Sequence, residues 1–240
     1  MQASIDENKP RPKPNLAAET PADVYPIEQL VGGEEVLKQM QVKVWIDTIQ
    51  SGADVPTSSL FVAKRLVRTV ESGGVKLVRV LKYTLLLIEW FKSLRPHGKD
   101  GKKVPALSQM GALTQNWGSD LPASLSRRFA LGGSGGGGGG ILNRHAHDTL
   151  LTHLLALTLH IDNFSTNTHD IAQDLRLTPA GAGKYYQELG ASVGMPTEAE
   201  RGRMGIPRGG GARRVARLRV PVVLPRSGGE RGGRGRGRGR

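Results

Sequence analysis

A run of glycine from Gly132 to Gly140, interrupted only by Ser134, limits how this chain can fold. Such a sequence behaves as a flexible tether and adds no side chain to a core. A phosphate-binding loop would need a strand before it and a Lys-Ser or Lys-Thr pair after it, and Ile141 and Leu142 follow instead. The chain is therefore expected to fold as two domains, residues 24–131 and 141–225.

Before the glycine run, apolar spacing predicts helices over about residues 34–49, 60–72 and 75–94, with shorter ones over 107–113 and 121–129. The helix at 75–94 is apolar on most of its circumference and should be the buried helix of its domain. Ser58 and Ser59 are candidate caps for the helix before it. The inward stripe of that earlier helix is expected to be Leu60, Ala63, Val67 and Val70.

Residues 1–23 are expected to form an extended, solvated leader. Pro10, Pro12 and Pro14 alternate there with basic residues. Proline fixes its own φ and disfavours the helical region for the residue before it. Nothing in this stretch has the apolar run of a signal peptide.

The excess of cations points to a polyanionic partner. Lys and Arg number 34 against 21 Asp and Glu, for a formal net charge of +13. Clustered positive charge of this size favours binding to phosphate backbones. In the first domain the candidate contacts are a basic stripe on one helix and a turn-rich basic loop, which comprise Lys64, Arg65, Arg68, Lys99, Lys102 and Lys103.

The second domain opens with a leucine-rich helix over about residues 142–161, and a helix-turn-helix pattern follows it. Thr168 is a candidate cap for a helix with Ile171, Ala172 and Leu175 inward, and Thr178 caps a second helix opened by a proline. The second helix has the length of a recognition helix that lies in a groove of DNA. The outward groups are expected to be Arg176, Lys184 and Tyr186. A plain αα-hairpin is the alternative.

A basic strand and a basic tail follow. Residues 215–224 alternate in the manner of a strand, and Pro221 is expected to confine that strand to a sheet edge. Helix, helix-turn-helix and basic β-element, in that order, are the parts of a winged helix. Further candidate DNA contacts here are Arg213, Arg214, Arg217 and Arg219. Residues 226–240 form an Arg-Gly tail, expected to be disordered alone and to bind nucleic acid through Arg231, Arg234, Arg236, Arg238 and Arg240.

The sequence contains no pattern typical of a catalytic site, a metal site or a membrane-spanning segment. Cysteine is absent, which excludes disulfides, thiolate zinc sites and cysteine nucleophiles. Five histidines lie between His145 and His169, but none forms an i, i+4 pair of the HExxH kind. No apolar run reaches the roughly 18 to 20 residues of a membrane span. No cofactor, no metal and no catalytic residue is therefore predicted.

Several segments together resemble a known family. They are VYPIEQLVGG, SSLFVAKRLVR, LKYTLLLIEWF with its following GKDGKK, LLALTLHIDNFSTNTHDIAQDLRLT, YYQELGASV and VARLRVPVVLPR. These segments, from about Tyr25 to Leu224, are similar to the RNA polymerase I subunit of the forty-nine-kilodalton type, also called the polymerase-I-associated factor.

The resemblance implies a mainly α-helical tandem winged-helix fold with small β-wings. It also implies a non-catalytic, DNA-binding subunit in the nucleolus that supports initiation and elongation by RNA polymerase I, with the polymerase core and its initiation factors as partners. The family's amino-terminal module, which dimerises with a second polymerase I subunit, has no counterpart in these residues, so that partnership is not implied. Two alternatives stay open, a winged-helix module that docks on proteins and an RNA-binding protein driven by the Arg-Gly tail.

Overall fold

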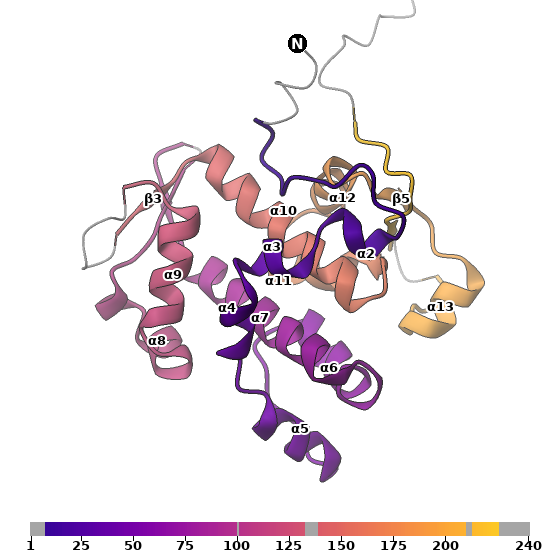
Figure 1. Ribbon diagram of the computed structural model, residues 1–240, viewed down its shortest axis with the longest axis horizontal. Coiled ribbons are helices and arrows are strands. Elements are labelled where there is room, and N and C mark those ends of the chain that lie inside the picture. The colour runs from indigo at the N-terminus through magenta and orange to yellow at the C-terminus, as the bar shows by residue number, and fades with distance from the viewer. Residues whose placement is uncertain (1–7, 100, 133–138, 210–212, 226–240) are drawn as a thin grey trace, which may run out of the picture.

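The computed structural model describes residues 8–99, 101–132, 139–209 and 213–225 (Figure 1). The Arg-Gly tail with Arg231, Arg234, Arg236, Arg238 and Arg240 lies outside the described residues, as do most of the glycine run and residues 1–7. The predicted fold class is confirmed: the described chain is mainly α-helical with two small antiparallel sheets.

Two long apolar helices form the centre of the molecule. Helix α7 (Gly74–Ser93) and helix α10 (Arg144–Ile161) pack against each other, and half of the residues of α7 and just over half of those of α10 are buried. Apolar residues from both sides of the glycine run belong to one hydrophobic core, which includes Trp90 and Leu154, each 0% exposed. The division into two domains stays a prediction, and the two parts share this core.

Short helices precede and flank α7. They are α2 (Pro21–Val24), α3 (Ile27–Val31), α4 (Glu34–Lys38), α5 (Lys43–Gln50), α6 (Leu60–Ser72), the 3-10 turn η1 (Leu107–Gln109), α8 (Gly111–Trp117) and α9 (Asp120–Phe129). The single helix predicted over 34–49 is therefore wrong. Met40 and Val42 interrupt it, because their side chains turn into the core and are only 1% and 5% exposed.

Helix α6 buries a different face from the predicted one. Ser59 caps the helix as expected, accepting a hydrogen bond from the Val62 backbone N–H. The buried side chains are Phe61, Val62, Arg65, Leu66 and Thr69, whereas Ala63 is exposed and Val67 is 47% exposed. This face recurs every three to four residues, as helix packing requires, but it is rotated from the predicted stripe.

The predicted basic loop after α7 is a β-hairpin. Strands β1 (Arg95–His97) and β2 (Gly101–Lys103) pair antiparallel, and β3 (Ile141–Leu142) adds a third strand beside β2. Leu131 and Ile141 exchange backbone hydrogen bonds of 2.9 and 3.0 Å, so the two ends of the glycine run lie side by side. Residues that follow the run thus complete a sheet begun before it.

The second half has the element order of a winged helix. After α10 come β4 (Ser165–Asn167), α11 (Thr168–Asp174), α12 (Pro179–Glu188), β5 (Ser192–Gly194), α13 (Glu198–Met204) and β6 (Val215–Arg217). The antiparallel sheet has the order β4-β6-β5. The edge position predicted for the last strand is wrong: β6 is central, because it ends at Arg217 and Pro221 lies beyond it.

The caps of the helix-turn-helix are partly as predicted. Thr178 caps α12, accepting a hydrogen bond of 3.0 Å from the Gly181 N–H. For α11 the cap is Asn167, one residue before the predicted Thr168. The inward positions are confirmed, since Ile171, Ala172 and Leu175 are at most 3% exposed.

The leader from residue 8 onward packs on the folded chain, contrary to the prediction of a solvated segment. It passes beside α10 and α12 in Figure 1. Arg11 is 8% exposed and donates to the Glu188 carbonyl at 3.1 Å. Thr152 of α10 donates to the Pro10 carbonyl at 2.8 Å. The prolines of this segment have no backbone N–H but keep their carbonyls, and here the Pro10 carbonyl and the Arg11 side chain attach the segment to α10 and α12.

Candidate nucleic-acid interface

The basic stripe of α6 lies against the second half of the chain. Arg65 is 5% exposed, its Nε is 2.8 Å from both carboxylate oxygens of Asp162, and its Nη1 is 3.1 Å from Asp170. Lys64 pairs with Asp170 and Arg68 with Asp162, each at 2.7 Å. The prediction that Arg65 contacts DNA is wrong, because its guanidinium is buried and both of its carboxylate partners are buried too.

Electrostatics keep this cluster charged. Burial by itself lowers the pKa of Arg65, but the carboxylates of Asp162 and Asp170 outweigh burial and raise that pKa above its ordinary value. Asp162 also accepts a 2.6 Å hydrogen bond from Thr166, so the acid is held from several directions. Asp162 and Asp170 are therefore members of a buried charged network that joins α6 to the second half of the chain. Lys64 and Arg68 are 45% and 44% exposed at their side chains, but they are already paired.

A third acid joins α6 to the second half of the chain. Asp174, at the end of α11, accepts hydrogen bonds from the Leu60 and Phe61 N–H groups at 3.0 and 2.9 Å and from the Ser59 hydroxyl at 2.7 Å. The first turn of a helix has backbone donors without an intrahelical partner, and a carboxylate there is favoured by the helix dipole. The free backbone N–H groups at the amino-terminal end of α6 are thus hydrogen-bonded by an acid from the second half of the chain.

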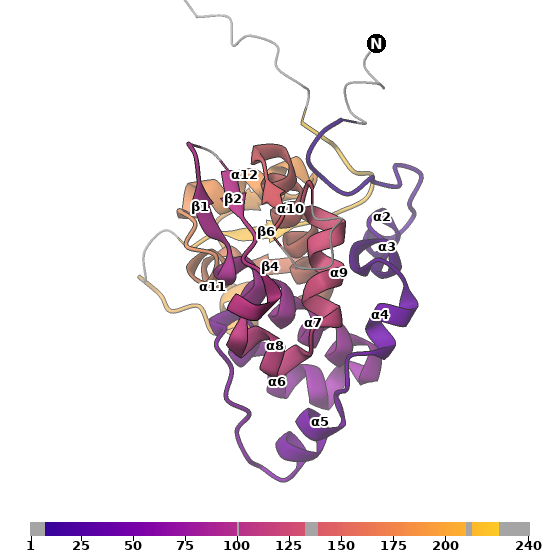
Figure 2. The same cartoon turned by 90° about the vertical axis from the view of Figure 1, so that its left-hand side faces the viewer.

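The β1–β2 hairpin carries cations of a different kind. Arg95, Lys99 and Lys103 are exposed and Lys102 is half-buried. Within the part of the chain that the structure describes, none of these four side chains has an ion pair or hydrogen bond. Figure 2 shows the hairpin on the side of the molecule that faces the viewer.

This cationic hairpin is continuous with α10 and α12. In the sheet, Lys102 and Lys103 of β2 lie opposite Leu142 and Ile141, which lead directly into α10. Arg144, in the first turn of α10, lies 4.0 Å from Asp148, and Asp148 accepts a 2.6 Å hydrogen bond from Tyr185 of α12. We call the exposed and half-buried cations along this path the hairpin surface: Arg95, Lys99, Lys102, Lys103, Arg144 and Lys184.

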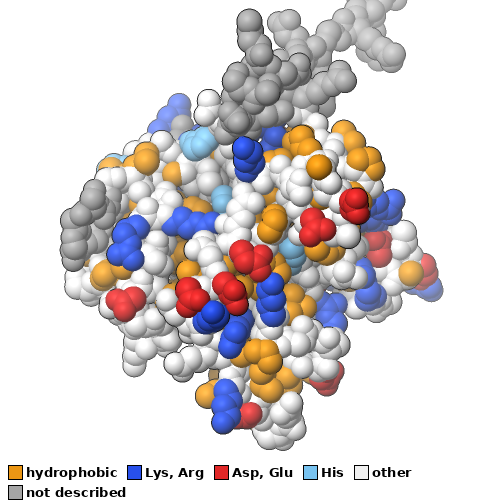
Figure 3. Space-filling view, in the orientation of Figure 1, with side chains coloured by type: hydrophobic (Ala, Val, Ile, Leu, Met, Phe, Trp, Pro, Cys, Tyr) orange, Lys and Arg blue, Asp and Glu red, His pale blue; other side chains and the backbone are white. Residues whose placement is uncertain are grey.

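Other faces mix their charges. Over α3, α4 and α7 the space-filling view shows acidic and basic side chains next to one another (Figure 3). Lys76 pairs with Glu28 at 2.7 Å and Lys38 with Glu35 at 2.8 Å. A phosphate backbone meets carboxylates on this face, which makes it a poorer polyanion site than the hairpin surface.

One tyrosine of α12 does not lie where it was predicted to lie. Tyr186, predicted to face outward and contact DNA, is 0% exposed, and its hydroxyl is 2.6 Å from that of Thr158. Burial raises its pKa above the ordinary value. Tyr186 is therefore a core residue, and the prediction was wrong. The outward groups of this region are Lys184, which is exposed, and Arg176, which is exposed at a φ of 53° in the turn before α12.

The wing arginines divide into paired and exposed side chains. Arg217 of β6 donates to Glu200 through Nε at 2.6 Å and Nη2 at 2.5 Å, and these hydrogen bonds lower the pKa of Glu200 to about 2. Arg214 and Arg219 are exposed and Arg213 is half-buried, and within the described residues none of the three side chains is bonded.

Helix α13, which holds Glu200, was missed by the sequence reasoning. Its signal was present in the sequence: Thr197 and Glu200 form a capping box, with the Thr197 hydroxyl accepting from the Glu200 N–H and the Glu200 carboxylate accepting from the Thr197 N–H. Glu200 is the acid that compensates Arg217, so missing this helix left Arg217 counted as an unpaired cation.

Within residues 8–99, 101–132, 139–209 and 213–225 there is no helix long and apolar enough to cross a membrane. The same residues contain no group of three or more His, Cys, Asp or Glu side chains placed to hold a metal ion.

The fold and its cationic surface define a mainly α-helical protein with small β-wings, one of which follows a helix-turn-helix. Its family is shown by comparison: the chain belongs to the A49-like RNA polymerase I associated factor family, whose model matches residues 1–225. The resemblance of the sequence segments to that family is thereby confirmed.

Two curated relatives are similar along almost the whole chain. The DNA-directed RNA polymerase I subunit RPA49 of Saccharomyces cerevisiae is 25% identical over 237 residues, which cover 93% of this chain and 55% of the relative. The corresponding subunit rpa49 of Schizosaccharomyces pombe is 25% identical over 237 residues, covering 94% of this chain and 52% of the relative. The chain thus spans about half the length of the curated relatives it matches.

Proposed function

We propose that this chain is a non-catalytic accessory subunit of RNA polymerase I that binds DNA through phosphate contacts, with little base readout. In that role it supports initiation and elongation on ribosomal RNA genes in the nucleolus. The observation that carries the proposal is the hairpin surface, where Arg144 alone lies near an acid, 4.0 Å from Asp148, and the other five cations have no acidic partner among the described residues.

Exposure and charge favour DNA over other ligands at this surface. Lysine and arginine side chains that are free of carboxylates can neutralise phosphates and release counterions, which supplies most of non-specific DNA affinity. The surface also joins a β-hairpin to α12, the second helix of the helix-turn-helix, whose position in related folds is in or along a groove. Arg176, Arg213, Arg214 and Arg219 remain candidate contacts outside the hairpin surface.

The test is a salt series of duplex DNA binding with a triple variant, Lys99→Ala, Lys102→Ala and Lys103→Ala. Because each phosphate contact contributes about 0.9 to the slope of log K against log salt, this variant should lower the slope by about 2 to 3. The loss should be the same for unrelated sequences, since phosphate contacts carry no sequence information.

The matched control is Lys38→Ala with Lys76→Ala, which removes lysines that are already paired with Glu35 and Glu28. It should leave the slope nearly unchanged. If the triple variant and the control lower the slope equally, the hairpin surface is not the DNA site. If neither does, the winged helix is better regarded as a protein-docking module.

A further inference from the structure

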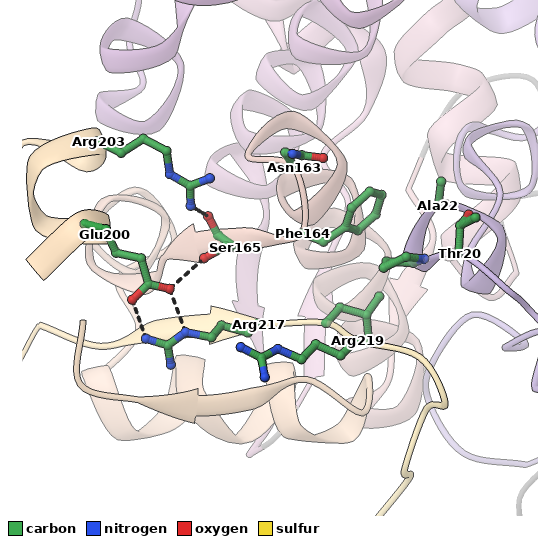
Figure 4. A pocket seen from close by; sticks show the side chains of 12 residues that line it. Thr20, Ala22, Asn163, Phe164, Ser165, Glu200, Arg203, Arg217 and Arg219 are labelled. Atoms are coloured by element: carbon green, nitrogen blue, oxygen red, sulfur yellow. Dashed lines mark hydrogen bonds and ion pairs between the residues drawn. The ribbon is translucent and has the colours of Figure 1, made fainter. Parts of the chain in front are cut away.

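A cleft on the second winged helix lies apart from the hairpin surface. It has a volume of about 720 Å³ and is formed by four segments: residues 20–22, the turn after α10, α13 and β6 (Figure 4). The turn contributes Phe164 at the end of α10, whereas Arg144 of the hairpin surface lies at its beginning. An α-helix of 18 residues is about 27 Å long. The cleft and the hairpin surface therefore lie at opposite ends of α10.

Arginine dominates the charge of this cleft. Arg203, Arg217 and Arg219 line it, and Glu200 is the only acid among its lining residues. Glu200 is engaged by Arg217, and Ser165 donates to the same carboxylate at 3.0 Å. Arg203 has one hydrogen bond, from Nη2 to the Ser165 carbonyl at 3.2 Å, and Arg219 has none within the described residues. Two guanidinium groups thus have donors available for an anion.

The arginines lie on two sides of the cleft, where a bound ligand could contact them. In Figure 4 the guanidinium groups of Arg217 and Arg219 lie on one side of the cleft and Arg203 on the other, with Ser165 and Glu200 between them. The remaining lining is largely apolar, and Phe164 and Leu218 belong to it. An arginine rim over an apolar wall fits a ligand that is both acidic and apolar.

The turn that bears Phe164 is held in an uncommon backbone conformation. Asn163 and Phe164 have φ values of 49° and 59°, in the left-handed region that bulky residues rarely adopt. The Phe164 N–H donates to the Leu159 carbonyl at 2.6 Å, and the Leu218 N–H donates to the Phe164 carbonyl at 2.9 Å. The surrounding structure therefore fixes this residue at the cleft wall, and such fixed strain is common at binding sites.

We propose that this cleft binds an acidic, partly apolar peptide segment of a partner protein. Arginine clusters are a recurring means of recognising acidic motifs. An extended peptide would set its carboxylates against Arg203 and Arg219 and its apolar side chains against the half-buried Phe164 and Pro21. A nucleic-acid strand fits less well, because a single aromatic ring lines the cleft and strand-binding grooves use several such rings to stack successive bases.

The test measures the binding of a fluorescein-labelled peptide of Asp-Asp-Leu repeats to the full chain by fluorescence anisotropy. Ala199 lines the cleft, is exposed and lies in the first turn of α13. Ala199→Glu adds a carboxylate beside the arginines, whereas Ala199→Gln adds the same bulk without charge. The Glu variant should weaken peptide binding about tenfold, and the Gln variant should have little effect.

Arginine variants supply the converse test. Arg219→Ala should weaken peptide binding about tenfold, the size of one charge-assisted hydrogen bond. Arg214→Ala removes an equally exposed arginine outside the cleft lining and should leave binding unchanged. Lys184→Ala, on the hairpin surface, should also leave it unchanged, so this proposal and the DNA proposal succeed or fail separately.

Three results would overturn the proposal. One is equal weakening by Arg219→Ala and Arg214→Ala, which would show general attraction to a basic protein. Another is equal binding by the Ala199→Glu and Ala199→Gln variants. The third is tight, Arg219-dependent binding of a dT oligonucleotide that displaces the peptide, which would assign the cleft to a nucleic-acid strand.

Discussion

Replacing Arg65 by methionine should destabilise the whole molecule, because the buried carboxylates of Asp162 and Asp170 lose the guanidinium that pairs with them. Asp162 and Asp170 are 5% and 2% exposed. Methionine keeps an apolar chain in place of the arginine stem, but it loses the stacking of the guanidinium carbon over the Phe61 ring, whose centroid lies 3.8 Å away. The variant also removes the charge, the hydrogen bonds to both carboxylates and the 3.1 Å hydrogen bond from Nη1 to the Phe61 carbonyl.

The expected loss is about 3 kcal/mol of unfolding free energy. Removing one partner of a buried ion pair costs about 3 to 5 kcal/mol, since an uncompensated charge stays buried. The lower end applies here, because Arg68 and Lys64 still reach Asp162 and Asp170 at 2.7 Å. Lys64→Met is the matched control. Its side chain is 45% exposed, and exposed pairs contribute about 0 to 1 kcal/mol.

Urea unfolding followed by circular dichroism measures both losses. The midpoint should fall for Arg65→Met with an unchanged slope, since the surface exposed on unfolding is the same. Adding Asp170→Asn to Arg65→Met should recover part of the loss, because it removes one stranded charge. Equal destabilisation by Arg65→Met and Lys64→Met, within about 0.5 kcal/mol, would refute the assignment of Arg65 to a buried network.

Three further outcomes follow from the structure. Burial lowers the pKa of His153 to about 4 from 6.5, so the unfolded chain takes up a proton first as pH falls. Stability should drop between pH 6.5 and 4 by on the order of 2 to 3 kcal/mol, and His153→Leu should flatten this dependence in urea unfolding at several pH values. Thr178→Ala should cost about 0.5 to 2 kcal/mol through loss of the α12 cap while DNA affinity in filter binding stays unchanged. A protease site inserted between Gly132 and Gly140 should give two fragments that still elute together on gel filtration, because α7 and α10 share a core; separate elution would show independent domains.

The apolar spacing of the sequence predicts where most of the longer helices lie, but it does not fix which face of each helix is buried. On α12 the error was one residue, between Tyr185 and Tyr186. Both are amphipathic side chains whose hydroxyl finds a partner when buried, so spacing alone does not choose between them. The choice is made by α10, where Thr158 meets Tyr186 and Asp148 meets Tyr185.

The candidate site was predicted in part. The hairpin lysines were recognised as a basic stretch, but their strand pairing was not, because the partner β3 comes after the glycine run. Arg65 was misassigned for a related reason. Its acids lie 97 and 105 residues further along the chain, and a helical projection of α6 holds no information about them. Long-range ion pairs of this kind become visible only when the tertiary fold is known.

The bond from Asp174 to the start of α6 bears on how the chain acquires its structure during synthesis. Three donors of this turn depend on an acid that lies 113 to 115 residues downstream. On the ribosome, the α6 segment emerges long before Asp174 has been translated. Ser59 alone caps the helix during that interval, and water solvates the other donors. The first turn of α6 therefore becomes fully ordered late, when α11, which carries Asp174, has left the exit tunnel and docked against α6.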